Sequence, residues 1–320
     1  MPDLKAKFPC FENPIIELQN RITKLTESEA GPSEIEDLEG KRKKLVDEIY
    51  SNLNSYQKVQ LARHPMRPHS LDYIEGIFDD FLELHGDRKF GDDEAVVGGL
   101  ASLSGETFMV IGQQKGRTPE ENLRRNYGMP HPEGYRKALR LMRLAEKFSI
   151  PVVSFIDTPG AYPGVKAEER GQAEAIASNL KEMMDLKTTV IVIVIGEGGS
   201  GGALGMAVGD KILMLEYSVY FVCTPEACSA ILWKDSTMAE TAAENLRLTA
   251  KDLLGLGVID EIVPEPPGGA HWDYAGTCEI IKRRIKHHRG ILKRVKTENL
   301  LERRYKKFRG MGVYSREKQK

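Results

Sequence analysis

Several features that would place this chain in other classes of protein are missing from its sequence. Its 320 residues contain only four cysteines, which form no C-x-x-C pair and have no nearby histidine at zinc spacing: Cys10, Cys223, Cys228 and Cys278. We expect reduced thiols in a cytoplasmic protein without a metal site. No run of 18 apolar residues is present, and the first ten residues lack the apolar centre of a signal peptide. The sequence therefore predicts neither a membrane span nor a secretion signal.

Strong net charge is also absent, because 46 basic residues nearly balance 47 acidic ones. The balance hides an uneven distribution. Between Lys282 and Lys320 there are sixteen lysines and arginines against three glutamates, which leaves 30 basic and 44 acidic residues before them. No aromatic residues alternate with these charges in a pattern suited to base stacking. We therefore favour pairing of the basic segment with an acidic surface of its own protein or of a subunit over nucleic-acid binding.

The most informative stretch runs from Thr188 to Glu216. The β-branched run from Val190 to Ile195 is too short for a membrane span and predicts a strand buried on both faces. Helix-forming residues begin at Ala203, so the glycines between form a strand-to-helix turn where backbone N–H groups can face another molecule. These glycines are Gly196, Gly198, Gly199, Gly201 and Gly202.

Three interpretations of this glycine turn stay open at this point. The spacing matches G-x-G-x-x-G and Glu216 lies 20 residues beyond Gly196, as in a dinucleotide-binding unit. Only about two helical turns fit before the next strand begins at Lys211, which counts against that interpretation. The alternatives are an oxyanion hole, in which N–H groups stabilise developing negative charge, and a purely structural turn.

A second loop of the same kind follows the buried strand Pro151 to Asp157. Proline and glycine alternate from Thr158 to Gly164, which predicts a bent loop with free backbone N–H groups. If the two strands are neighbours, the N–H groups of Gly160 and Ala161 converge with those of Gly201 and Gly202 on one oxygen atom. Ser200 has no histidine nearby and is interpreted as a turn residue; Asp157 fits either a general base or a cap of the turn.

Basic residues gather next to these loops. Between Lys115 and Lys147 there are nine basic residues against four acidic ones. They lie in a loop from Gln113 to Pro132 and on a helix from Glu133 to Phe148. A solvated helix face explains part of this pattern. The position of Lys115 and Arg117 after a strand end favours a binding surface for phosphates or a carboxylate.

Strand, loop and helix recur three times between residues 95 and 223, which predicts an α/β spiral. A hairpin of strands, 95–103 and 107–113, opens it. In front, apolar residues at helical spacing predict an antiparallel helical hairpin over residues 12–62, its second helix capped by Ser33 and Glu36. A further helix is expected over residues 71–84.

The following long motifs resemble the carboxyltransferase α subunit of multi-subunit acetyl-CoA carboxylase: LARHPMRPHSLDYI, IGQQKGR, RRNYGMPHPEGYRKALRLM, FIDTPGAYPG, GEGGSGGAL and IVPEPPGGAH. The resemblance implies an α/β fold of the crotonase type, a ββα spiral over residues 66–270. A helical hairpin (1–65) is expected before it and a basic helical extension (271–320) after it.

The resemblance also implies a reaction, in which a carboxyl group passes from carboxybiotin to acetyl-CoA and gives malonyl-CoA for fatty acid synthesis. Gly201 and Gly202 would bind the ureido oxygen of biotin, with Gly160 and Ala161 as weaker candidates. The side chains of Lys115, Arg117 and Arg170, together with Gly199, are expected to contact substrate.

The absence of a Met-Lys pair means that biotin must arrive on another protein. The resemblance implies three partners: a zinc-containing β subunit, the biotin carboxyl carrier protein and biotin carboxylase, with ATP binding a property of the complete complex. An α2β2 assembly without membrane association is expected, in which this chain alone is half an enzyme. A dinucleotide-binding oxidoreductase and a non-catalytic scaffold for the β subunit are the alternatives.

Overall fold

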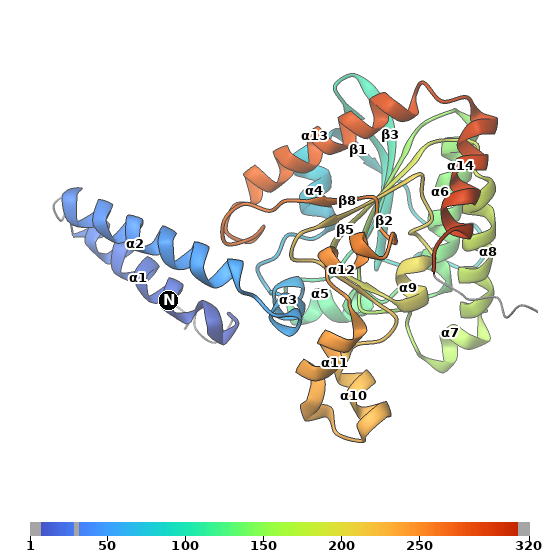
Figure 1. The fold of residues 1–320 in the computed structure, drawn as a ribbon. Helices are drawn as coiled ribbons and strands as arrows, with labels where there is room; N and C mark the ends of the chain where they lie inside the picture. The colour runs from blue at the N-terminus through green and yellow to red at the C-terminus, as the bar shows by residue number, and fades with distance from the viewer. Residues whose placement is uncertain (1–7, 29–31, 313–320) are drawn as a thin grey trace, which may run out of the picture.

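The computed structural model describes residues 8–28 and 32–312. One eight-stranded mixed sheet forms the centre (Figure 1). Its strands are β1 (Asp79–Glu83), β2 (Val96–Leu103), β3 (Glu106–Gln113), β4 (Val152–Thr158), β5 (Val190–Gly199), β6 (Lys211–Leu215), β7 (Val219–Phe221) and β8 (Glu261–Val263). Their order is β1-β2-β3-β4-β5-β6-β8, and β7 pairs with the far end of β5. The first three strands are antiparallel, and every later pair is parallel.

Helices cover both faces of this sheet. They are α1 (Asn13–Glu27), α2 (Pro32–Ser51), α3 (Ser55–Ala62), α4 (Ser70–Ile77), α5 (Pro119–Arg124), α6 (Pro132–Lys147), α7 (Val165–Glu169), α8 (Gln172–Asp185), α9 (Ser200–Leu204), α10 (Pro225–Trp233), α11 (Ala239–Leu246), α12 (Ala250–Gly255), α13 (Tyr274–Leu292) and α14 (Thr297–Arg309). None of the helices in the described part of the chain combines the length and apolar character that crossing a membrane requires.

The core lies on both sides of β4 and β5, every residue of which is buried. Val190, Val192 and Val194 point into a cluster with α6 and α8. Ile191, Ile193 and Ile195 point the opposite way, into a cluster with α4 and α13. This alternation is the two-residue period of a strand, and the covered faces explain why the run is apolar throughout. The predicted doubly buried strand is confirmed.

The helix expected over residues 71–84 is wrong in its second half. Helix α4 ends at Ile77, and the chain turns into edge strand β1, which pairs with β2. Asp79 and Asp80 are poor helix formers, and Asp80 adopts a φ of 54°. A Cβ on Gly99 would lie 2.0 Å from the Leu82 carbonyl oxygen, so this glycine permits the approach of β1.

Other boundaries differ by less. The loop expected from Gln113 to Pro132 contains the short helix α5. Helices α7 and α8, which follow the first glycine-containing loop, are separated at Gly171, whose φ of 83° interrupts a right-handed helix. The helical extension expected after residue 270 is divided into α13 and α14 by a break between Leu292 and Thr297. Helix α2 already includes Ser33, so any cap at its start lies outside the described residues.

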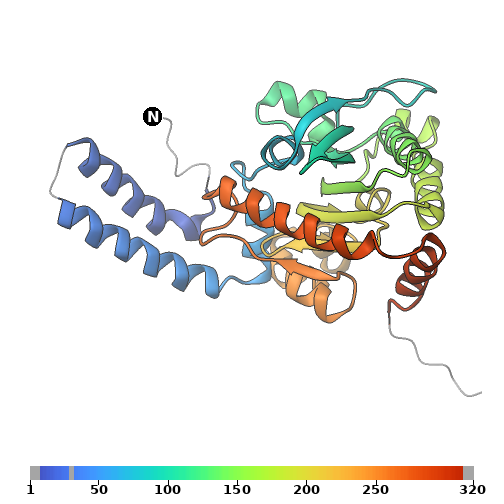
Figure 2. The ribbon, with the colours of Figure 1, turned by 90° about the horizontal axis from the view of Figure 1, so that it is seen from above.

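Helices α1 and α2 form the predicted antiparallel hairpin, which projects from the body (Figures 1 and 2). The second expected helix ends at Ser51, however, and α3 packs on α11 of the body. Asn54 donates to Glu240 at 2.7 Å, and the Ser55 N–H donates to Glu244 at 2.9 Å. Polar contacts thus fix the segment after the hairpin to the body.

The basic C-terminal helices pair with acidic residues of the body, as the sequence predicts. Arg304 is 1% exposed, and its guanidinium contacts both carboxylate oxygens of Asp210 at 2.9 Å. It also donates to the carbonyl oxygens of Met183, Leu186 and Thr188. Buried cations are stable only with such pairing, so Arg304 anchors α14 to the end of α8.

Candidate active site

The two glycine-containing loops lie in backbone contact at the ends of neighbouring strands β4 and β5. A Cβ on Gly202 would lie 2.3 Å from the carbonyl carbon of Gly160 and 2.4 Å from the nitrogen of Ala161. A Cβ on Gly199 would lie 2.1 Å from the carbonyl oxygen of Pro159. Only glycine fits at these two positions without moving the backbone. The structure therefore brings together all five loop residues that were expected to form the site.

Three of the four expected N–H donors are available in this structure. The N–H groups of Gly201 and Gly202, in the first turn of α9, and that of Ala161 donate to no other described residue. The N–H of Gly160 instead donates to the Thr158 hydroxyl at 3.1 Å, and this hydroxyl donates to the Gly160 carbonyl at 2.7 Å. Gly160 therefore shapes its loop with an engaged N–H group.

Lys115 belongs to a charge network at the ends of β4 and β5, just before the two loops. Its ammonium contacts Asp157 at 2.7 Å and Glu197 at 2.9 Å, and Arg63 contacts the other oxygen of Glu197 at 2.8 Å. Burial alone raises the pKa of the Asp157 carboxyl, but the Lys115 charge and the His69 contact more than offset it. The pKa of Asp157 is therefore held well below its usual range.

This network bears on two expectations. Asp157 is a permanently ionised carboxylate that also accepts the N–H of Glu197 at 3.1 Å, which is a structural arrangement and a poor one for a general base. Lys115 has two carboxylate partners and has little charge left to attract an anionic substrate. Its expected contact with substrate stays a prediction.

The two arginines expected to contact substrate are engaged in ion pairs within the chain. Arg117 is exposed and contacts Asp72 at 2.5 Å. Arg170 contacts both oxygens of Glu133, at 2.7 and 3.1 Å, and lies over the ring of Phe90. Neither arginine forms a hydrogen bond or ion pair with the two loops in the described part of the chain. Their substrate contacts stay predictions.

Two residues of the site were missed from the sequence. Gln113, at the end of β3, donates to the Gly202 carbonyl at 2.7 Å, and the hydroxyl of Tyr135 in α6 donates to the same oxygen at 3.1 Å. Both side chains are fully buried. Both lie within the long motifs quoted above, which was the available signal, but Gln113 ends a strand beside Gln114 and Tyr135 lies on an apolar helix face, and neither pattern indicates a hydrogen bond to the Gly202 carbonyl.

An apolar pocket of about 330 Å³ adjoins α9. It is lined by Ser200, Leu204, Tyr220, Phe221, Val222, Leu246, Leu253 and Val258. Val222, in its lining, is 71% exposed, and two apolar side chains of α10, Ile231 and Leu232, are 73% and 63% exposed. Apolar surface left exposed in this way favours a site for a ligand or a partner.

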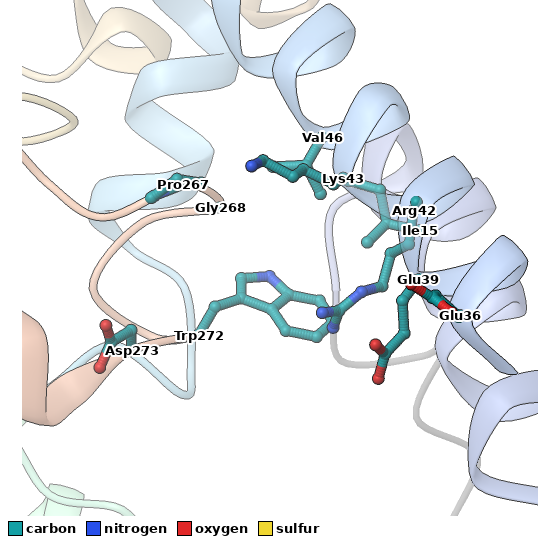
Figure 3. Close-up of a pocket in the computed structure, with 11 residues that line it drawn as sticks. Ile15, Glu36, Glu39, Arg42, Lys43, Val46, Pro267, Gly268, Trp272 and Asp273 are labelled. Carbon is teal, nitrogen blue, oxygen red and sulfur yellow. The ribbon is translucent and has the colours of Figure 1, made fainter. Parts of the chain in front are cut away.

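A larger hollow of about 570 Å³ lies elsewhere, between the helical hairpin and the loop before α13 (Figure 3). Trp272 and Ile15 contribute apolar surface, and Arg42, Lys43 and Glu39 contribute charge. None of its lining residues belongs to the two loops.

Next to that hollow, Glu12, His64 and His271 have side-chain atoms close enough to suggest a metal site. The hydrogen bonds argue against it. The Met66 N–H donates to Nδ1 of His64 at 3.0 Å, so Nδ1 carries no proton and the neutral ring holds its proton on Nε2. That Nε2 lies 3.6 Å from Glu12 without a hydrogen bond, and because it carries the proton it has no lone pair to offer a metal. We interpret the cluster as a structural clasp.

Comparisons with known proteins agree with the motifs. A protein family described as acetyl co-enzyme A carboxylase carboxyltransferase-like matches residues 9–312. The acetyl-coenzyme A carboxylase carboxyl transferase subunit alpha of Geobacter metallireducens is 55% identical over 310 residues, which cover 95% of this chain and 97% of that protein. The protein of the same name from Methylococcus capsulatus is 54% identical over 316 residues, covering 97% and 98%.

Solved structures share the fold at much lower identity. A Pseudomonas malonate decarboxylase hetero-tetramer in complex with coenzyme A has a TM-score of 0.60 at 13% identity, covering 73% of this chain and 91% of the matched chain. The beta subunit of P. aeruginosa geranyl-CoA carboxylase has a TM-score of 0.57 at 17% identity, covering 78% and 46%. Transcarboxylase 12S has a TM-score of 0.54 at 20% identity; this chain spans 41% of its matched chain. The expected crotonase-type α/β fold is confirmed.

The dinucleotide interpretation is wrong. Helix α9 has five residues, too few for the helix of a dinucleotide-binding unit, and Glu216 accepts a hydrogen bond from the Glu265 N–H at 3.3 Å. The similarity to the α subunits extends over nearly the whole chain, including the hairpin and the basic extension. This chain belongs to the acetyl co-enzyme A carboxylase carboxyltransferase family.

Proposed function

We propose that this chain is the α half of a carboxyltransferase that moves a carboxyl group from carboxybiotin to acetyl-CoA and forms malonyl-CoA, the committed step of fatty acid synthesis. The observation that carries the proposal is the 55% identity, over 310 residues, to a protein named as that α subunit. The backbone contact between the Gly160–Ala161 and Gly201–Gly202 loops supports it. Carboxybiotin, when bound, supplies the activated carboxyl group.

The role of the loops in this reaction is to stabilise negative charge. Transfer places negative charge on the ureido oxygen of biotin and on the thioester oxygen of acetyl-CoA. We assign the N–H groups of Gly201 and Gly202 to the ureido oxygen, with Ala161 as a weaker third donor. Donors fixed before the reaction need no rearrangement as charge develops, and each contributes about 10²- to 10³-fold in rate. The apolar pocket beside α9 has room for a small bicyclic group.

Neither loop receives a hydrogen bond from a side-chain base in the described part of the chain. The Asp157 carboxylate is ion-paired with Lys115, and the ring of His131 stacks on Tyr162 of the first loop with its Nδ1 facing Asn126. Removal of the methyl proton of acetyl-CoA therefore falls to a group that the co-substrate brings to the site. The loops and the pocket orient the reactants and exclude water.

The exposed apolar surface around Val222 and Ile231 supports a partner subunit beside the pocket. We propose that this partner is the zinc-containing β subunit, in an α2β2 assembly, and that the biotin carboxyl carrier protein and biotin carboxylase complete the enzyme. All four cysteines are free thiols, which supports a reducing, cytoplasmic environment.

The test is carboxyl transfer from malonyl-CoA to biocytin, measured with this chain alone, with the β subunit alone and with both. Activity in the mixture only is the expected result, because the site is completed by the partner. Activity of this chain alone would contradict a shared site. Inactivity of a mixture that has assembled by size-exclusion chromatography would contradict the proposed reaction.

A further inference from the structure

The carbonyl group of Gly202 is left without a partner by its own helix. In α9 the Gly205 N–H donates to Gly201 at 3.0 Å and the Met206 N–H donates to Ala203 at 3.0 Å, so the Gly202 oxygen is passed over. Gln113 and Tyr135 take the place of the missing helix bonds, from β3 and from α6. Two donors occupy both lone pairs of one carbonyl oxygen, which fixes the plane of its peptide group.

Gln113 joins the two loops through a single amide group. Its Oε1 accepts the backbone N–H of Asp157, at the end of β4, at 3.1 Å, and its Nε2 donates to Gly202 at 2.7 Å. The orientation of the amide is unambiguous, because the Asp157 N–H can only donate and the Gly202 carbonyl can only accept. The Ser70 hydroxyl donates to the Gln113 carbonyl at 2.6 Å and holds the end of β3.

Tyr135 supplies the second donor from another direction. Burial raises the pKa of its hydroxyl far above the usual value, so the hydroxyl keeps its proton at every working pH. Asn179 donates to the backbone carbonyls of Tyr135 and Gly205, both at 2.9 Å, and so links α6 to the end of α9. Helix α9 is too short to be stable alone, and these contacts define its orientation.

We propose that Gln113 and Tyr135 are positioning residues for the carboxyl-transfer reaction. The carbonyl that they hold belongs to the peptide after Gly202, so fixing it sets the orientation of the first turn of α9, which carries the N–H groups of Gly201 and Gly202, against the Gly160–Ala161 loop. The inference rests on the proposed function, since it concerns the donors assigned to the ureido oxygen. Neither side chain is placed in contact with substrate.

The first experiment compares Tyr135→Phe with the matched control Tyr73→Phe in the complex with the β subunit. The Tyr73 hydroxyl is equally buried and has no hydrogen-bond partner in the described structure, so its removal disturbs neither loop. We expect kcat for transfer from malonyl-CoA to biocytin to fall about tenfold in Tyr135→Phe, with KM values for both substrates within about twofold of wild type. Tyr73→Phe keeps wild-type kcat.

The second experiment uses Gln113→Glu, which has nearly the same shape. When protonated, the introduced carboxyl donates through O–H to Gly202 and accepts from Asp157, as the amide does; when ionised, it has no proton for Gly202. The titratable groups on the adjoining elements are the carboxylate of Asp157, whose N–H the side chain accepts, its partners Lys115 and His69, and Tyr135 of α6, which donates to the same Gly202 oxygen. Burial and Asp157 favour the protonated form, so the ratio of variant to wild-type kcat rises as pH falls.

The outcomes separate the inference from the proposed function. An inactive wild-type complex counts against the reaction itself. With an active wild type, unchanged kcat in Tyr135→Phe and a pH-independent ratio in Gln113→Glu would overturn the positioning role. Parallel losses in the Tyr73→Phe control or a lowered unfolding temperature in both tyrosine variants would also overturn it, because they indicate general loosening of the core.

Discussion

At the scale of single residues, the site depends on where the backbone leaves no room for a side chain. Gly201 and Gly202 are neighbours in one loop but differ in their surroundings. A Cβ on Gly201 would approach only Ile176 atoms, at 3.8 and 3.9 Å, which is ordinary contact, whereas a Cβ on Gly202 collides with the backbone of Gly160 and Ala161. An added methyl group therefore fits at Gly201 and clashes with the backbone at Gly202.

We predict that Gly202→Ala lowers kcat of the assembled complex by about 10²-fold or more, because the loops must separate and the donors lose alignment. Gly201→Ala, which adds the same methyl group and keeps its N–H, stays within about threefold of wild type. Steady-state carboxyl transfer and size-exclusion chromatography check both variants. Full activity of Gly202→Ala in an intact complex would favour the scaffold interpretation.

The glycines of the site could be predicted from the sequence because their residue type itself carries the information. Gln113 and Tyr135 could not, because their role comes from hydrogen bonds between segments distant in sequence. The same applies to Thr158, whose hydroxyl occupies the Gly160 N–H. The pairing of Lys115 with two carboxylates could not be predicted from the sequence either, because Asp157 and Glu197 lie at the ends of different strands.

At the scale of secondary-structure elements, the buried Arg304 is the most connected of the residues that hold helix α14, beside Lys307, which pairs with Asp260, and the buried Leu300. Arg304 makes all its contacts with α8, with the segment after α8 and with Asp210, and is otherwise surrounded by the core. Removal of one partner from such a pair leaves a buried charge uncompensated, with a cost of about 3–5 kcal/mol in the free energy of unfolding.

We therefore predict that Arg304→Met increases amide hydrogen exchange over residues 297–309 before it affects the central strands. The adjacent Arg303→Met serves as the control, because the Arg303 side chain is exposed. Hydrogen exchange followed by mass spectrometry distinguishes the two variants. Equal protection of α14 in both variants would show that the remaining contacts, including that of Lys307 with Asp260, hold the helix without Arg304.

Elements with a strong hydrophobic periodicity could be predicted from the sequence. Elements whose secondary structure depends on pairing with a neighbouring strand were predicted wrongly. The run from Val190 to Ile195 needs no partner to be identified as a buried strand. Edge strand β1 contains two aspartates and depends on β2 for its hydrogen bonds, so its pattern resembles the end of the preceding helix. The division of α7 from α8 depends on the backbone conformation of Gly171. Helix-forming residues lie on both sides of this glycine, so the sequence does not indicate a break.

At the scale of the whole molecule, the clasp of Glu12, His64 and His271 links the hairpin to the body. Glu12 is 0% exposed and accepts hydrogen bonds from Tyr50 at 2.5 Å and from Trp272 at 3.2 Å, and it contacts His271 at 3.0 Å. Burial and the neighbouring His271 lower the pKa of His64 to about 3. The folded protein therefore holds a neutral imidazole where the unfolded chain takes up a proton below about pH 6.5.

The unfolded state binds more protons than the folded state between about pH 6.5 and pH 3, so the free energy of unfolding falls as pH decreases through this window. His64 contributes at most about 1.4 kcal/mol per pH unit. We predict that His64→Gln, which keeps an acceptor for Met66 and a donor toward Glu12, flattens this decrease. Urea denaturation at pH 7, 6 and 5 measures it, with the exposed His85→Gln as control. An unchanged slope in His64→Gln would contradict the assignment.

The clasp also determines when, during synthesis of the chain, the hairpin can dock on the body. Glu12 and His271 lie 259 residues apart in sequence. At a synthesis rate of about 5–20 residues per second, the hairpin leaves the ribosome roughly 13 to 50 s before the residues that dock it. During that interval Glu12 has Tyr50 and His64 within reach but lacks His271 and Trp272, so this early segment completes its contacts late. The hairpin can therefore complete its docking on the body only after residues 271 and 272 have been synthesised.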